Sequence, residues 1–148
     1  MAGKAKAHRL RIGRHGEANQ IYLVTTVTWR RVPYFSDLYH GRLLVKQLYQ
    51  QQAITLCHVV MPDHLHWLMQ LAEGADLSAV VQKLKSCTTR ELRRAGIEQV
   101  VWQKGFHDHA LRSEEDIKAF ARYIVANPIR AGLVNSVKQY SLWDAIWL

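Results

Sequence analysis

The stretch AITLCHVVMPDHLHWLMQL, residues 53–71, carries most of the information about the fold. It begins with β-branched and apolar residues typical of a strand, breaks at Pro62-Asp63, which favours a turn, and continues as a second apolar run. The pattern predicts a β-hairpin with strands at residues 53–61 and 64–71. Because side chains alternate along a strand, His64 and His66 are expected on one face and Leu65 on the other.

Flanking segments extend this hairpin into a longer α+β pattern. Residues 21–29 (IYLVTTVTW) read as a strand, and residues 37–52 have the apolar spacing of a helix. Asp76 or Ser78 is expected to begin a helix to about residue 94, a short strand follows Gly105, and Ser113 caps a helix to about residue 126. This order predicts a ferredoxin-like, RRM-like βαββαβ antiparallel sheet with helices on one face, plus a C-terminal helix.

Length and charge indicate one basic domain. The 148 residues suit a single domain over residues 1–148, and the net charge of +8 favours a polyanionic partner such as nucleic acid. Residues 1–16 read as a basic flexible arm whose Arg11 and Arg14 could contact phosphates, although a solvated tail has the same composition. No apolar run is long enough to span a bilayer and no signal peptide is evident, so a cytoplasmic protein without membrane contact is expected.

Two pairs of histidines have spacing suited to a metal. Same-side imidazoles of His64 and His66 can bind one divalent cation and leave other positions open, or they can lie in an ordinary polar patch. His107 and His109 form a second pair with Asp108 between them. A central strand needs an apolar residue facing the core, which favours the pair around Leu65.

A tyrosine and an asparagine lie one helical turn apart after Ser113. Tyr123 flanks the apolar stripe of that helix, and Asn127 is four residues later, so both side chains can face one groove. Each also has a structural interpretation. Tyr123 could lie at the edge of the core, and Asn127 followed by Pro128 is a usual N-cap and first residue of a short helix.

Five segments along nearly the whole chain are similar to segments of one family. They are LRIGRHG (10–16), IYLVTTVTWRRVPYF (21–35), VVMPDHLHWLM (59–69), VWQKGFHDHALR (101–112) and RYIVANPIRAGLV (122–134). The chain resembles the REP-associated tyrosine transposases, bacterial relatives of single-tyrosine insertion-sequence transposases in the HUH superfamily. HUH denotes histidine, hydrophobic residue, histidine. Residues 140–144 (YSLWD) depart from the Tyr-x-x-Ser-Ser tail frequent in that family.

The resemblance implies a reaction and its residues. Tyr123 is the implied nucleophile, and His64, His66 and Asn127 are the implied ligands of a Mg²⁺ or Mn²⁺ ion. His107 and His109 lack the hydrophobic middle residue and fall outside the motif. The implied activity is a metal-dependent single-stranded DNA endonuclease and strand transferase that forms a 5′-phosphotyrosine intermediate and acts on hairpin-forming repetitive extragenic palindromes.

Further basic and aromatic residues are candidates for contacts with DNA. Arg30, Arg31, Lys83, Lys85 and Arg90 are further candidate DNA contacts, and Lys83, Lys85, Lys104 or the metal could help deprotonate Tyr123. Trp29, Trp102 and Trp143 could stack on bases, although large aromatics more often fill a core.

A monomer is expected, with a dimer as the alternative. Two other functions fit the same residues: a hairpin DNA- or RNA-binding protein that does not cleave, and a phosphodiesterase in which water attacks.

Overall fold

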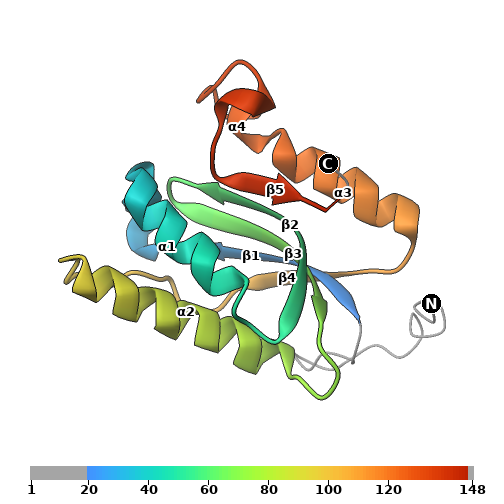
Figure 1. Cartoon of the computed structure of the whole chain (residues 1–148), viewed down its shortest axis with the longest axis horizontal. Coiled ribbons are helices and arrows are strands. Elements are labelled where there is room, and N and C mark those ends of the chain that lie inside the picture. The colour runs from blue at the N-terminus through green and yellow to red at the C-terminus, as the bar shows by residue number, and fades with distance from the viewer. Residues whose placement is uncertain (1–19, 147–148) are drawn as a thin grey trace.

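The computed structural model describes residues 20–146, which form one antiparallel sheet with helices on both faces (Figure 1). The strand order is β4-β1-β3-β2-β5. The strands are β1 (Ile21–Val27), β2 (Ala53–Met61), β3 (His64–Leu71), β4 (His107–Leu111) and β5 (Trp143–Ala145). The helices are α1 (Leu38–Leu48), α2 (Leu77–Arg94), α3 (Glu114–Val125) and α4 (Asn127–Arg130), with short 3-10 turns at Trp29–Arg31, Tyr34–Ser36 and Val137–Gln139. The predicted α+β class and hairpin are confirmed, and β1 pairs with β3 at the centre of the sheet.

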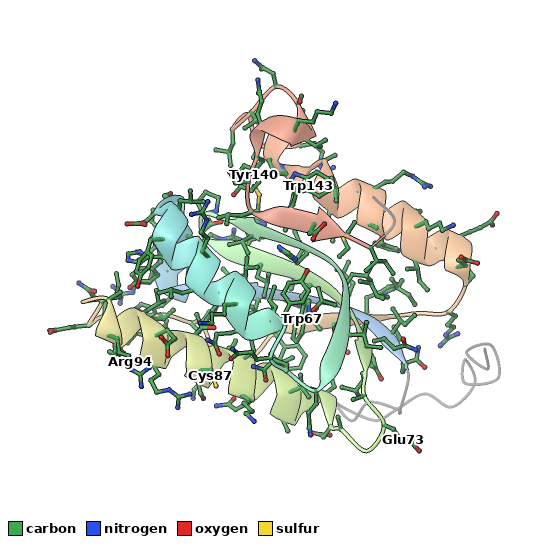
Figure 2. The ribbon with its side chains drawn as sticks, viewed as in Figure 1. Trp67, Glu73, Cys87, Arg94, Tyr140 and Trp143 are labelled. Atoms are coloured by element: carbon green, nitrogen blue, oxygen red, sulfur yellow. The ribbon has the colours of Figure 1, made fainter. Side chains whose placement is uncertain are left out.

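The two faces of β3 enter two separate cores. Leu65 and Trp67 are fully buried with residues of α1 and α2, such as Leu44 and Leu84. Trp67 is labelled in Figure 2. Leu68 is buried on the opposite face with α3. The helix stripe that contacts it consists of Ile117, Ala121 and Ile124. Since His64 and His66 share the parity of Leu68, both histidines belong to the face that α3 covers.

Side-chain caps explain where the long helices begin. The carboxylate of Asp37 accepts hydrogen bonds from the first turn of α1, and that of Asp76 accepts one from Ala79 N. Ser113 Oγ accepts from Asp116 N at the start of α3. These bonds satisfy N–H groups that have no partner within the helix, as predicted for Asp76 and Ser113. Among residues 20–146, no helix is both long and apolar enough to cross a membrane.

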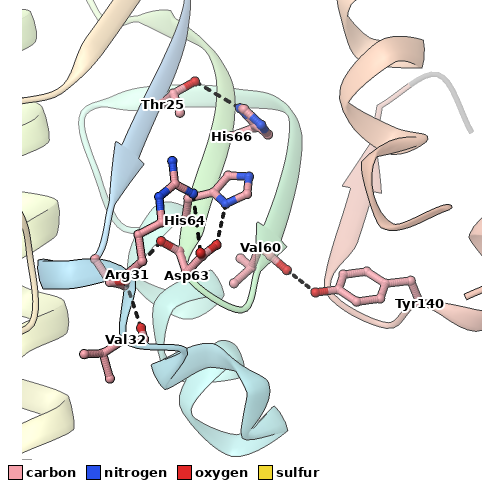
Figure 3. Close-up of polar contacts among 9 residues, drawn as sticks. Thr25, Arg31, Val32, Val60, Asp63, His64, His66 and Tyr140 are labelled. Atoms are coloured by element: carbon pink, nitrogen blue, oxygen red, sulfur yellow. Dashed lines mark hydrogen bonds and ion pairs between the residues drawn. The ribbon is translucent and has the colours of Figure 1, made fainter. Parts of the chain in front are cut away.

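The C-terminal segment differs from the sequence-based expectation in two ways. β5 was not predicted, because three residues with no alternating pattern carry too little signal. It pairs with β2, where Val60 N donates to Leu142 O at 2.9 Å and Tyr140 Oη donates to Val60 O (Figure 3). The reading of Asn127 as an N-cap was wrong: Ala126 is the N-cap of α4, and Asn127 makes no capping hydrogen bond.

His58 of β2 is a titratable side chain buried against α1. It is 3% exposed, and its Nδ1 lies 3.2 Å from Tyr49 Oη. Burial lowers the pKa of His58 from 6.5 to about 4, and the negative charge of Asp144 offsets only part of that effect. The protein therefore holds a neutral imidazole at neutral pH.

Folding stability should consequently fall as the pH drops from about 6.5 to about 4. In that window the unfolded chain binds a proton at His58 that the folded chain does not, so acid favours unfolding. A pKa difference of this size corresponds to about 3 kcal/mol. Urea unfolding of wild type and His58→Gln with EDTA present should show the variant losing about 3 kcal/mol less across this window. Equal pH slopes would contradict the assignment, because His66 contributes equally to both proteins.

Candidate active site

His64 and His66 lie side by side at the centre of the sheet. Their ring centroids are 4.9 Å apart, with an angle of 82° between the rings. β1 and β2 flank β3 on either side, so the backbone that carries the pair is held by two ladders. The side chain of His64 is 17% exposed, and His66 is partly buried. The pair is therefore rigidly placed and still open to a ligand.

Hydrogen bonds orient both imidazoles through the same ring nitrogen (Figure 3). His64 Nδ1 lies 2.8 Å from Asp63 Oδ1, and His66 Nδ1 lies 3.0 Å from Thr25 Oγ1. Arg31 Nη1 in turn donates to Asp63 Oδ2 at 3.4 Å. A carboxylate can only accept, so His64 Nδ1 carries the proton and its Nε2 has a free lone pair. With the Thr25 hydroxyl accepting from His66, both Nε2 atoms are available as ligands.

The protonation of these groups suits cation binding. Partial burial raises the pKa of Asp63, but the hydrogen bonds and charges of His64 and Arg31 outweigh it and lower the pKa overall. Burial, followed by the charges of His64 and Arg130, lowers the pKa of His66 to about 4. At neutral pH Asp63 is therefore charged and His66 is neutral, which is the state in which imidazole binds a metal.

Tyr123 lies on α3 and is linked to Asn127 by Arg130. Tyr123 is 59% exposed, and the Arg130 guanidinium carbon lies 3.8 Å from the centroid of its ring. Arg130 Nη1 donates to Tyr123 O, and Arg130 Nη2 donates to Asn127 Oδ1, both at 2.8 Å. Because α3 packs on the sheet through Ile117, Ala121 and Ile124, these residues at the α3–α4 junction belong to the face of the sheet that bears His64 and His66.

The donor set fits a divalent ion that keeps open positions. Among residues 20–146, no three His, Cys, Asp or Glu side chains are arranged to hold a metal ion. Two imidazoles therefore need a donor of another type, and the amide oxygen of Asn127 is the candidate on this face. Imidazole with amide oxygen and water suits Mn²⁺ and is compatible with Mg²⁺, whereas a closed structural zinc site requires four ligands.

The second histidine pair shares this face but lies two strands away. His107 is opposite Thr25 on β1, and Thr25 is opposite His66 on β3. His109 instead packs against Phe120 of α3, with ring centroids 5.5 Å apart. The two pairs are thus separated by β1, and they do not form one cluster.

The candidate DNA contacts fall into two regions. Arg30 and Arg31 are exposed in the turn after β1, close to Asp63, and have left-handed backbone at φ 53° and 57°. That conformation costs of order 1 kcal/mol per residue, and it persists because neighbouring bonds fix the turn. Thr28 N donates to Asp63 O at 2.9 Å. Lys83, Lys85 and Arg90 lie on α2, across the sheet from the histidines, and Arg11 and Arg14 lie outside the described residues.

The candidate lysines near the nucleophile and the candidate stacking tryptophans also lie in different parts of the structure. Lys85 Nζ donates to Gln103 O at 2.9 Å and to Gly105 O, which ties α2 to the loop before β4. The α2 lysines therefore do not approach Tyr123. Trp102 packs on Phe35 with ring centroids 5.6 Å apart, and Trp143 Nε1 donates to Val137 O at 2.8 Å. Trp29 is 40% exposed beside the Arg30 side chain, which leaves it the most accessible of the three predicted stacking residues.

A histidine–hydrophobic–histidine strand at the centre of a split βαβ sheet defines the HUH class of proteins. Within that class the chain belongs to the family of IS200-like transposases, whose model matches residues 18–127. The match includes both histidines and Tyr123, and it ends at Asn127.

Two curated proteins and one solved structure that resemble this chain are also named as tyrosine transposases. The chain is 33% identical over 103 residues to a Haemophilus influenzae protein named as a REP-associated tyrosine transposase, and 35% identical over 83 residues to the Escherichia coli REP-associated tyrosine transposase. These matches cover 62% and 55% of this chain, and they span only 57% and 48% of the relatives. A solved REP-associated tyrosine transposase bound to a REP hairpin has 23% identity and a TM-score of 0.74, covering 90% of this chain and 81% of that one. At that identity the structure supports the fold.

Arg130 is the residue of this corner that the sequence did not reveal. Counting helical turns from Tyr123 would place position 130 on the same face, seven residues later. Pro128 predicts a break in the helix, which removes that inference. The contact forms because α4 follows the break directly and returns the side chain toward α3.

Removing the carboxylate behind His64 should weaken metal binding. Asp63→Ala deletes the partner that fixes the ring and its proton, and such changes typically cost about 10- to 100-fold in metal affinity. Titration with Mn²⁺, followed by the electron paramagnetic resonance of the free ion, measures the dissociation constant. Asp63→Asn should have a smaller effect, and Glu73→Gln, in the turn after the far end of β3, serves as the charge-matched control. Equal affinity in wild type and Asp63→Ala would contradict the role of this bond.

Proposed function

We propose that this chain is a metal-dependent single-stranded DNA endonuclease and strand transferase with Tyr123 as its nucleophile. One observation carries the proposal: the Arg130 guanidinium contacts both Tyr123 and Asn127, and α3 packs on the face of the sheet that bears His64 and His66. Membership of the IS200-like transposase family supports it. The chain spans about half the length of the relatives it matches, so their activity is a proposal for this protein.

His64, His66 and Asn127 would hold the ion, and each has a defined task. A bound Mg²⁺ or Mn²⁺ supplies Lewis-acid stabilisation of charge on a non-bridging phosphate oxygen. Asp63 and Thr25 keep the two imidazoles turned with Nε2 outward. Tyr123 offers an exposed phenol to a polymer that could not enter an enclosed cavity.

The proposed chemistry balances without a further reactant. The Tyr123 phenol loses its proton, its Oη bonds to phosphorus, and the bond from phosphorus to the 3′ oxygen breaks. The leaving oxygen takes up a proton and becomes a free 3′-hydroxyl, while the 5′-phosphate stays on Tyr123. Attack by a second 3′-hydroxyl reverses these steps and rejoins the strand. The covalent intermediate stores the phosphodiester bond that water would otherwise hydrolyse.

The proposed substrate is single-stranded DNA beside a hairpin of the repetitive extragenic palindrome type. A solved relative of the same fold is bound to a REP hairpin. Arg30 and Arg31, next to Asp63, are proposed phosphate contacts of the single strand, together with Arg11 and Arg14. Lys83, Lys85 and Arg90 on α2 are proposed contacts for the stem, which would have to pass round the edge of the sheet.

We further propose that residues 1–148 work as one domain and as a monomer, with Tyr123 acting in cis. α3 packs on the sheet of its own chain through Ile117, Ala121 and Ile124. Tyr123 therefore lies on the same face as its own histidine pair. This packing supports a site formed within one chain.

Incubation of wild type with a labelled hairpin oligonucleotide and Mn²⁺ should give a covalent adduct on a denaturing gel. Tyr123→Phe should give no adduct and bind the hairpin within about 2-fold of wild type, because it lacks only the nucleophilic oxygen. His64→Ala and His66→Ala should bind the metal poorly and therefore form no adduct. Cleavage without an adduct would favour attack by water, and binding without cleavage would favour a hairpin-binding protein.

Mixing two inactive variants tests the cis arrangement. His64→Ala combined with Tyr123→Phe should stay inactive, since neither chain has both parts of the site. Restored adduct would instead show that the tyrosine acts in trans between two subunits.

The salt dependence of hairpin binding should distinguish basic side chains that contact phosphates from those that do not. Each phosphate contact that is lost reduces the slope of log K against log salt by about 1. Arg30→Ala and Lys83→Ala are each expected to reduce the slope by about that amount, whereas Lys46→Ala on α1 should leave it unchanged. Fluorescence anisotropy in the Tyr123→Phe background measures the slopes without cleavage. An unchanged slope in either variant would remove that region from the proposed interface.

A further inference from the structure

Arg130 touches three parts of one corner of the molecule. Its guanidinium covers one face of the Tyr123 ring, with the carbon 3.8 Å from the centroid. Nη1 donates to Tyr123 O and Nη2 to Asn127 Oδ1, both at 2.8 Å. The side chain thus touches the proposed nucleophile at its ring and its backbone and touches a proposed ligand at its amide oxygen. Arg130 lies beyond the residues that match the family, so the match assigns it no role.

These contacts restrict a side chain that has little else to hold it. Tyr123 is 59% exposed, so packing on the core leaves its ring largely free to turn. A planar cation stacked on one face, and hydrogen-bonded to the backbone of the same residue, limits the rotamers that the phenol can occupy. The bond to Asn127 Oδ1 sets the orientation of that amide at the same time.

The local backbone makes this arrangement possible. Pro128 has no N–H, so the ladder of α3 stops, and α4 starts at Asn127. Arg130 N and Ala131 N then donate to Ala126 O and Asn127 O, which closes a tight corner. The corner places residue 130 over the last turn of α3, where carbonyl groups favour a cation.

From these contacts we infer that Arg130 is a positioning residue for the reaction: it holds the Tyr123 phenol and the Asn127 amide in one fixed relation on the face of the sheet that bears the histidine pair. This inference rests on the proposed function of Tyr123. Arg130 acts here through its planar geometry as well as its charge. A lysine keeps the charge but cannot stack and bridge two acceptors in the same plane.

A first test examines the contact in the protein without metal or DNA. Uniform labelling with 3-fluorotyrosine gives one ¹⁹F resonance per tyrosine, and the Tyr123→Phe variant assigns the resonance of residue 123. Arg130→Lys and Arg130→Ala should shift or broaden this resonance and leave the others in place. Arg122→Gln, an exposed charge removed from the same helix next to Tyr123, is the matched control and should have no such effect.

A second test measures what the contact does. In single-turnover reactions with the hairpin oligonucleotide and Mn²⁺, Arg130→Lys and Arg130→Ala should form the adduct about 10- to 100-fold more slowly, as expected when a reacting group is misplaced by about 1 Å. The hairpin dissociation constant, measured in the Tyr123→Phe background, should change less than about 2-fold. The thermal midpoint of Arg130→Lys should stay close to wild type, which separates positioning from a purely structural role.

The outcomes distinguish this inference from the proposed function. Wild-type rates in Arg130→Lys would overturn positioning by geometry, and so would an unmoved Tyr123 resonance. A loss of hairpin affinity equal to the loss of rate would also overturn it, and would make Arg130 a phosphate contact. If wild type itself forms no adduct, the proposed function fails and the positioning role fails with it, although the ¹⁹F shift would still report the contact.

Discussion

The pleat of β3 is the constraint on which both cores and the candidate site depend. Leu65, Trp67 and Met69 enter the core beneath α1 and α2, while His64, His66 and Leu68 turn to the face that α3 covers. A slip of one residue would bury both imidazoles and bring Trp67 out of its core. Because apolar residues fill both faces of the strand, that slip is costly. The histidine rings are therefore 4.9 Å apart as a consequence of folding alone.

The position of β3 in the sheet also supplies the partners of those rings. A central strand has neighbours on both sides, and β1 brings the Thr25 hydroxyl next to His66. The tight turn before β3 brings Asp63 next to His64, and the strained turn after β1 brings Arg31 to Asp63. Hydrogen bonds that orient ligands before binding reduce the ordering that a metal must impose. The strain at Arg30 and Arg31 is thus held beside the candidate site.

Local patterns predicted the hairpin, the helix caps at Asp76 and Ser113, and the common face of His64 and His66. These features depend on periodicity and on contacts within a few residues. β5 depends instead on its ladder with β2, and the neighbouring Tyr140–Val60 hydrogen bond joins positions 80 residues apart, so neither leaves a local pattern. The position of Arg130 could not be predicted, because proline interrupts a helix and helical spacing from Tyr123 cannot be counted past Pro128. The alternative prediction that Asn127 is an N-cap was wrong at the same junction, because α4 begins one residue earlier than the Asn-Pro pattern suggests.

The exposure of Tyr123 limits how its side chain can be oriented. Enzymes that act on small molecules gain from closing a cavity around the reacting atoms, whereas a polynucleotide must be admitted along an open surface. An open surface cannot orient a phenol through packing, so orientation has to come from directed contacts of the residue itself. The α3–α4 corner provides such contacts in one chain segment: a proline break, a returning arginine and an asparagine amide. The same segment packs on its own sheet through α3, and the rigidity of that core thereby extends to a side chain that is 59% exposed.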